Sequence, residues 1–241
     1  MYKYTLLGIR LGALGTIAAL CTGCPNPQTY GTPRTTPAGK IQHSLAAEGI
    51  GASSDTGSFT IPNAPTYTLR VGVADSVDIG ARIANLTSIG ADVKWNFVKS
   101  DSFDMAIDPG FQFFHLGGTS TDGMGNSVDA SVSVLYLNAP LMFGINVSDS
   151  VSIVPTAGIT YGWVSSEVTS SDESDAAASS TGIMLRPGIG FNFRISERFA
   201  LHPEITFLKP LEDQSTGLLY VFGLGFNFGN LPKFGAEAEA K

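Results

Sequence analysis

The 241-residue chain has little charge for its length. Lys, Arg, Asp and Glu make up 15% of its residues, whereas about 25% is usual in soluble proteins. So few charged residues are poorly suited to coating a large aqueous surface. The net charge is −7 and no run of Lys or Arg occurs, so the chain lacks the basic face that nucleic-acid phosphates require. We therefore expect no nucleic-acid partner.

Cysteine, histidine and long apolar runs are also scarce. Both cysteines, Cys21 and Cys24, lie near the N-terminus, so no disulfide framework can stabilise the rest of the chain. No apolar run reaches the ~18 residues of a membrane helix. The chain has 3 histidines and neither a cysteine cluster nor a glycine-rich phosphate loop. We therefore expect no metal and no other cofactor.

The N-terminus has the pattern of an export signal. Two cations precede a short apolar stretch that ends in Thr22-Gly23-Cys24, which predicts a signal peptide over 1–23. The small residue before Cys24 resembles the processing site of bacterial lipoproteins, and this resemblance implies a lipid on Cys24. The alternative is an ordinary cleaved signal with Cys24 unmodified. Residues 24–39 are rich in proline and lack periodicity, so they are predicted to be an extended periplasmic spacer.

The remaining chain has a period of two. In 182–195, every second residue is apolar and the intervening residues are small or polar, as expected for a β-strand with one apolar face. Ten segments alternate in this way or are rich in β-forming residues. They are 40–51, 65–74, 77–84, 88–98, 102–115, 131–147, 151–164, 182–195, 199–209 and 217–228.

The connections between these segments differ by position. Short connections fall at every second junction, and long polar ones fall at most of the others. The short ones are 75–76, 99–101, 148–150 and 196–198; the long ones are 52–64, 116–130, 165–181 and 210–216, with 85–87 as a brief exception. This parity predicts an all-β fold: a single closed antiparallel up-and-down transmembrane β-barrel of about ten strands, with eight the runner-up. Both ends of the barrel then lie on the periplasmic side, where a lipid on Cys24 would enter the inner leaflet.

If the apolar row faces lipid, the other row lines the barrel. The charged residues of that row are predicted to form a lumen charge network, with six acids and five permanent bases that can pair with one another. They are Glu48, Arg70, Asp78, Arg82, Asp92, Lys94, Asp104, Asp108, Arg186, Arg194, His202 and Glu204. Small barrels are filled by their own side chains. The prediction is therefore a structural role, or a narrow path for a small solute, without enzymatic activity.

The last strand carries a resemblance to a known class. Gly223, Phe226 and Phe228 match the terminal signature of bacterial outer-membrane β-barrel proteins, in the order glycine, two residues, aromatic, one residue, aromatic. The resemblance implies that the outer-membrane assembly machinery engages these three residues. It also implies a monomer surrounded by outer-membrane lipids and lipopolysaccharide. The barrel is predicted over 40–229, followed by a short periplasmic tail over 230–241.

Two alternatives stay open. A hydrolase at the barrel rim would use His115, which borders a loop containing Asp122, because a histidine beside a carboxylate is a common general base. A soluble periplasmic β-domain would be held at the membrane only by the lipid on Cys24. The pair His202 and Glu204 shares the predicted lumen face, where Asp104 or Asp108 is expected to approach it.

Overall fold

The computed structural model describes residues 26–55, 57–84, 87–121, 127–170, 176–211 and 217–234. The predicted signal peptide 1–23 and Cys24 lie outside these residues. Among the described residues, no helix is long and apolar enough to cross a membrane. The strands are β1 (Ile41–Ser54), β2 (Gly57–Ala74), β3 (Val77–Ala84), β4 (Ser88–Lys99), β5 (Phe103–Ile107), β6 (Gly110–Thr121), β7 (Ser127–Ser148), β8 (Val151–Ser170), β9 (Ala176–Leu185), β10 (Gly188–Ser196), β11 (Phe199–Pro210) and β12 (Leu218–Gly229).

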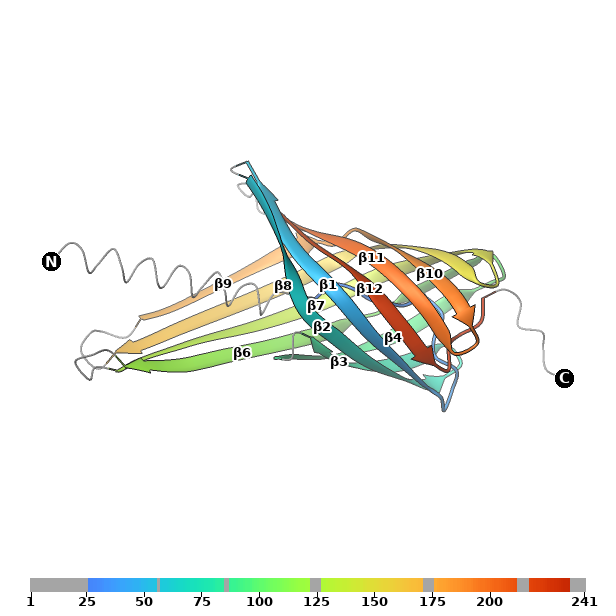
Figure 1. Ribbon diagram of the computed structural model, residues 1–241, viewed down its shortest axis with the longest axis horizontal. Coiled ribbons are helices and arrows are strands. Elements are labelled where there is room, and N and C mark those ends of the chain that lie inside the picture. The colour runs from blue at the N-terminus through green and yellow to red at the C-terminus, as the bar shows by residue number, and fades with distance from the viewer. Residues whose placement is uncertain are drawn as a thin grey trace.

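These strands form one closed antiparallel cylinder (Figure 1). The seam is closed by β1 and β12, whose register runs from Gln42↔Gly229 to Ser53↔Leu218. Strands β5 and β6 occupy a single strand position in the wall, because both pair with β4 and β7. Each such strand position is called a stave. Strands β9 and β10 are likewise two pieces of the stave between β8 and β11. The cylinder thus has ten staves, and the predicted up-and-down barrel is confirmed.

The two interrupted staves break at proline, at one level of the wall. Pro109 separates β5 from β6 and Pro187 separates β9 from β10, because proline has no N–H for the ladder. The residue before each proline still bonds to the neighbouring strand: the Asp108 N–H donates to the Pro140 carbonyl on β7, and the Arg186 N–H donates to the Gly158 carbonyl on β8. Since Pro140 and Gly158 are paired, Asp108 and Arg186 lie at the same height along the barrel axis.

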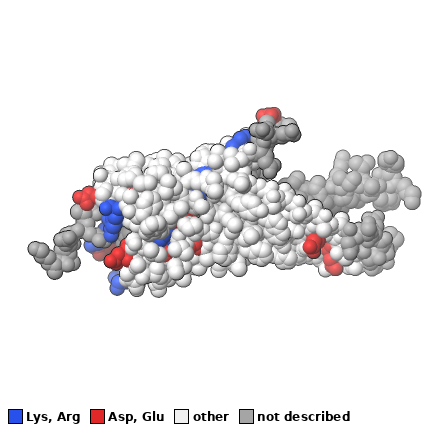
Figure 2. Space-filling view, turned by 180° about the vertical axis from the view of Figure 1, so that it is seen from behind, with Lys and Arg blue, Asp and Glu red and all other residues white. Residues whose placement is uncertain are grey.

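Outward and inward rows differ sharply in polarity. On β3, Ile79 and Ile83 are 46% and 48% exposed, whereas Asp78 is fully buried. Figure 2 shows the result on one flank, where charged side chains gather near the ends and the surface between them is largely uncharged. An apolar surface of this extent is unfavourable in water and favourable against lipid. The soluble-domain alternative needs the apolar row inside, so it is wrong.

The two ends of the cylinder are built differently. At one end, called the turn end, β2–β3, β4–β5, β7–β8 and β10–β11 are joined by the short connections that the sequence predicts. At the other, called the hairpin end, strands continue past the rim: β6, β7, β8 and β9 extend as one sheet, and β1 and β2 form a second extension (Figure 1). The predicted long loops 52–64, 116–130 and 165–181 are therefore mostly strand. These segments are polar because solvent meets both faces of the sheet there, although their backbones are paired as β-strands.

Inside the hairpin end, the inward row is apolar. Phe114, Val134 and Tyr136 form a buried cluster, with Val132 and Val164 packed against it. The sequence predicts a polar inward row throughout, so this cluster is a difference. Side chains of neighbouring staves fill the space at this level, and apolar side chains do so without unpaired polar groups.

Candidate functional site

The lumen of the barrel holds the chain's own N-terminal segment. Residues 26–36, called the plug, run inside the cylinder just before β1, and nearly all of them are buried. The sequence predicts that 24–39 is a spacer outside the barrel, and the structure corrects this for the plug. The segment has no periodicity of its own because its polar groups are matched to the barrel wall.

The turn end of the plug is fixed by Arg34. Its Nε donates to the Asp104 carboxylate at 2.9 Å, while its two terminal nitrogens donate to the carbonyls of Lys233 and Ser100, both at 2.7 Å. The arginine and Asp104 are both almost fully buried. A planar guanidinium thus joins the plug, the wall and the C-terminal tail through one fork of donors.

The middle of the plug is held by Glu204 on β11. Its carboxylate accepts hydrogen bonds from the Thr29 N–H at 3.0 Å, the Thr29 hydroxyl at 3.1 Å and the Tyr30 N–H at 2.7 Å. Tyr30 has a φ of 45°, a left-handed conformation that costs a residue with a Cβ about 1–2 kcal/mol. The charged hydrogen bonds of Glu204 stabilise this turn against its backbone strain.

The ring of Tyr30 occupies space left by glycine on β12. Gly223 and Gly225 both face inward, and a Cβ added to either would meet Tyr30. The Asn227 amide on the same strand donates to the Tyr30 carbonyl at 2.9 Å. Glycine is therefore required at these two positions by close approach of the plug.

The far end of the plug lies near the hairpin rim. The Asn26 amide donates to the Glu48 carboxylate and to the Thr66 hydroxyl, and the Gln112 amide donates to the Asn26 carbonyl at 2.6 Å. Gln112 pairs with Gly90, only two residues from the β3–β4 hairpin. The plug therefore spans most of the lumen, from the turn end to the hairpin rim.

One wall cation organises the carboxylates beside the plug. Arg70 bonds to Asp78 and Asp108, both at 2.9 Å, and also to Asp92. Lys94 lies 3.3 Å from Asp78 and donates to the carbonyl of plug residue Thr32. Buried charges persist in protein interiors when they are paired and hydrogen-bonded in this way.

The turn end is also covered by the start of the C-terminal tail. Leu231 and Phe234 are buried, and a terminal nitrogen of Arg194 donates to the Pro232 carbonyl at 3.3 Å. The described part of the predicted tail, 230–234, therefore folds back over the opening. Together with the plug it closes the barrel from this side.

Comparisons with known proteins bear on the fold. No protein-family model and no curated protein matches the sequence. Among solved structures, the chain is similar to the outer membrane protease OmpT from Escherichia coli, with a TM-score of 0.50 and 8% identity over 83% of this chain and 100% of that one. It is also similar to the translocator domain of the autotransporter NalP from Neisseria meningitidis, with a TM-score of 0.50 and 10% identity over 94% and 95% of the two chains. The chain is a β-barrel of the bacterial outer-membrane type.

Barrels of this type have short periplasmic turns, so we expect the turn end to lie in the periplasm and the hairpin end outside. The outward apolar rows meet the lipid of the bacterial outer membrane. All the charged residues predicted to line the lumen lie on inward rows. Asp92 and Arg194 are partly buried, and the rest are buried. The sequence analysis does not identify the plug residues. One signal was available: the predicted lumen residues include one more acid than base, which indicates that a further base enters the lumen. Arg34 of the plug is such a base.

The residues of the terminal signature face different ways. Gly223 points inward under Tyr30, while Phe226 and Phe228 lie on the outward row. The ring of Phe228 stacks on His43 at a centroid distance of 5.3 Å. Engagement of these residues by the assembly machinery stays a prediction.

The histidines do not form the predicted constellations. His115 is exposed, and its Nδ1 lies 2.9 Å from the Ser133 hydroxyl; Asp122 is outside the described residues. His202 is buried 3.6 Å from Glu204, but Asp104 and Asp108 bond to Arg34 and Arg70 instead. Among the described residues, no group of His, Cys, Asp or Glu is arranged to hold a metal ion.

Proposed function

We propose that this outer-membrane barrel is closed at rest, with a structural role or a narrow path for small solutes that opens when the plug moves. The observation that carries the proposal is the ladder of hydrogen bonds along the plug, from Arg34 at the periplasmic end to Asn26 near the hairpin rim. Because the plug is hydrogen-bonded at both ends and in the middle, it is an integral part of the barrel interior.

The space left beside the plug supports a closed resting state. Within the lumen, one cavity of about 30 Å³ lies near Arg82 and Arg186, and another of about 10 Å³ lies near Arg194. A larger hollow of about 440 Å³ lies at the turn end, beside Arg34, Thr35 and Asp75. The two lumen cavities hold about one or two water molecules. A hydrated solute can therefore pass only when the plug is displaced. The polar lining of the lumen favours small polar solutes over apolar ones.

Planar-bilayer conductance of the purified mature protein tests this proposal. We expect the wild-type barrel to show little steady conductance, and a variant lacking 26–36 to conduct. Gly225→Leu gives a second route, because its side chain would take the place of Tyr30, and Gly118→Leu is the matched control in open space. Heat-modifiable gel migration shows that each variant is folded. A large steady conductance of the wild type would contradict the closed state.

The surroundings of the barrel are part of the same proposal. We propose a monomer, inserted by the assembly machinery, that contacts outer-membrane lipids and lipopolysaccharide. A lipid on Cys24 needs a different place from the predicted inner leaflet, because two residues span at most about 7 Å and Asn26 lies near the hairpin rim. A lipidated Cys24 would therefore belong on the outer side. Fatty-acid labelling that is lost in Cys24→Ser tests the modification, and its absence in the wild type would exclude it.

A hydrolase is a second candidate, favoured by one observation. His115 and Ser133 lie within hydrogen-bond distance on the exposed face of β6 and β7, as a base and a nucleophile would. Among the described residues, no carboxylate accepts a hydrogen bond from His115. Peptide and lipid hydrolysis by the purified barrel, with Ser133→Ala and His115→Ala as controls, would test this role. No hydrolysis by the wild type would exclude it.

A further inference from the structure

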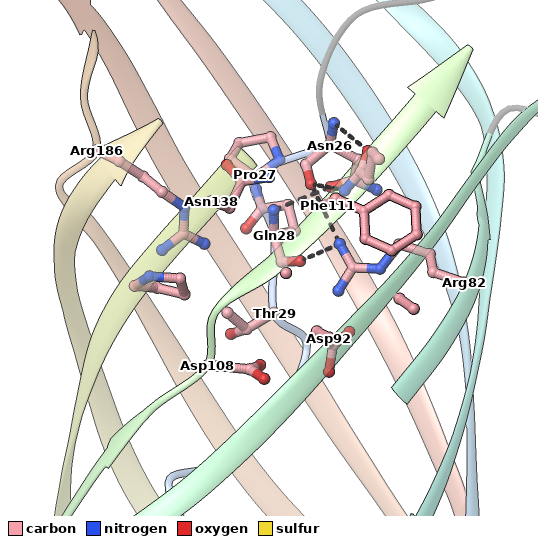
Figure 3. Close-up of a pocket in the computed structure, with 14 residues that line it drawn as sticks. Asn26, Pro27, Gln28, Thr29, Arg82, Asp92, Asp108, Phe111, Asn138 and Arg186 are labelled. Atoms are coloured by element: carbon pink, nitrogen blue, oxygen red, sulfur yellow. Dashed lines mark hydrogen bonds between the residues drawn. The ribbon is translucent and has the colours of Figure 1, made fainter. Parts of the chain in front are cut away.

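One buried cation in the lumen has open hydrogen-bond donors. Arg186 lies at the break between β9 and β10 and is 1% exposed. Its Nε and Nη1 have no hydrogen-bond partner among the described residues. The side chain lines the cavity of about 30 Å³ beside the plug, and Figure 3 shows its guanidinium extending into the lumen. A buried guanidinium with open donors is costly unless something else accepts from it.

The nearby carboxylates are already engaged. Asp92 and Asp108 line the same cavity, but both bond to Arg70. Glu204 accepts from the backbone of the plug at Thr29 and Tyr30. Asp92 and Asp108 therefore share Arg70, while Glu204 bonds to neutral groups of the plug and attracts Arg186 only from a distance. None of the ion pairs found among the described residues involves Arg186.

A second cation faces the same cavity. Arg82 donates from Nη1 to the plug carbonyls of Asn26 and Gln28, while its Nε has no partner among the described residues. Asn138 also lines the cavity, and its Oδ1 accepts from Thr160, so the group it can offer to a ligand is its amide N–H. The open groups of the cavity are thus donors, and two of them belong to cations.

We propose that this cavity is a binding site for one small inorganic anion of the size of chloride, held by the Nε and Nη1 donors of Arg186. The volume has room for about one or two water molecules, which suits a halide and excludes an organic carboxylate or a nucleotide. Guanidinium is a fixed, always charged donor, so the site needs no protonation change to bind. Since Pro27 and Gln28 form part of its wall, the anion also links the plug to β9 and β10.

Anomalous diffraction tests the site directly. Crystals of the mature barrel grown in bromide should show one ordered bromide in hydrogen-bond contact with Arg186, and that peak should vanish in Arg186→Met. A wild-type cavity that contains only water under the same conditions overturns the proposal. The result does not depend on whether the plug opens, so a failure of the conductance experiment and a failure of this one are distinguishable.

A solution measurement complements the crystal. We expect the unfolding midpoint of the wild type to rise saturably with chloride or bromide at constant ionic strength, with gluconate as the anion too large to enter. Ligands that bind only the folded state stabilise it in this way. The response should be lost in Arg186→Met, weakened in Arg186→Lys and retained in Arg198→Met, whose arginine is exposed. An equal halide response in Arg186→Met and the wild type would overturn the proposal.

Discussion

The Cβ of Tyr30 lies 2.9 Å from the position that a Cβ on Gly225 would occupy. Tyr30 belongs to the plug and Gly225 to the last strand of the barrel wall, 195 residues later in the chain. Their approach ties the two ends of the sequence together inside the lumen. It also gives the position of the plug a chemical readout.

We predict that Tyr30→Cys combined with Gly225→Cys forms a disulfide in a Cys24→Ser background. The Cβ–Cβ distance of 2.9 Å is shorter than the ~3.8 Å usual between the Cβ atoms of two disulfide-linked cysteines. The plug therefore needs to move by less than about 1 Å for the disulfide to form. The crosslinked chain should migrate differently on a denaturing gel until it is reduced. Tyr30→Cys with Gly118→Cys is the control, since Gly118 lies in open space on the extension. Equal crosslinking of both pairs would contradict a plug fixed at this place.

Glu204→Gln should loosen the plug without changing the lipid-facing surface. The carboxylate accepts three hydrogen bonds from Thr29 and Tyr30, and hydrogen bonds to charged groups contribute about 1.5–3 kcal/mol each. The neutral amide keeps the shape but loses this charge assistance. More frequent opening events in bilayer recordings are expected. Unchanged recordings would show that Glu204 does not hold the plug closed.

Arg34→Met should lower the free energy of unfolding by about 3–5 kcal/mol, the usual effect of breaking a buried ion pair. Among the described residues, the donors that then remain to Asp104 are the weaker ones of Asn146 and Ser100. Adding Asp104→Asn should restore part of the loss because no buried charge is then uncompensated. Urea unfolding in detergent micelles measures both variants, and exposed Arg198→Met should stay within about 0.5 kcal/mol of the wild type.

Ala81→Arg and Ala130→Arg form a matched pair that tests which surface meets lipid. Both alanines are exposed, but Ala81 lies in the middle of β3 and Ala130 on the part of β7 beyond the rim. An arginine facing the centre of the hydrocarbon layer costs about 2–4 kcal/mol, and one in solvent costs little. The two variants should therefore differ in unfolding free energy in lipid vesicles. Equal values would argue against this membrane position.

Much of the barrel was readable from the sequence, because its strands bury one face and leave the other to lipid. This requirement produces a period of two in the strands. On β3, outward Ile79 and Ile83 alternate with inward Asp78, Gly80 and Arg82, and short turns mark one end of the barrel. The extensions were misassigned because both of their faces meet water. There, pairing is set by the backbone and no alternation of polarity records it.

The plug could not be derived in the same way. Asn26, Gln28 and Arg34 satisfy their hydrogen bonds with wall residues that lie far away in sequence, so no local pattern reveals them. The clue was indirect: the predicted lumen row held one more acid than base, and the segment supplies Arg34 opposite Asp104. The balance of acidic and basic residues predicted to be buried is therefore informative where hydrophobic periodicity is absent.

The plug leads directly into β1, and β1 closes the seam with β12. The plug also bonds to residues on both sides of that seam, because Asn26 donates to Glu48 on β1 and Asn227 on β12 donates to the Tyr30 carbonyl. The joint between the first and last strands is therefore braced from inside by the residues that precede it. Deleting the plug is expected to weaken this joint as well as to empty the lumen.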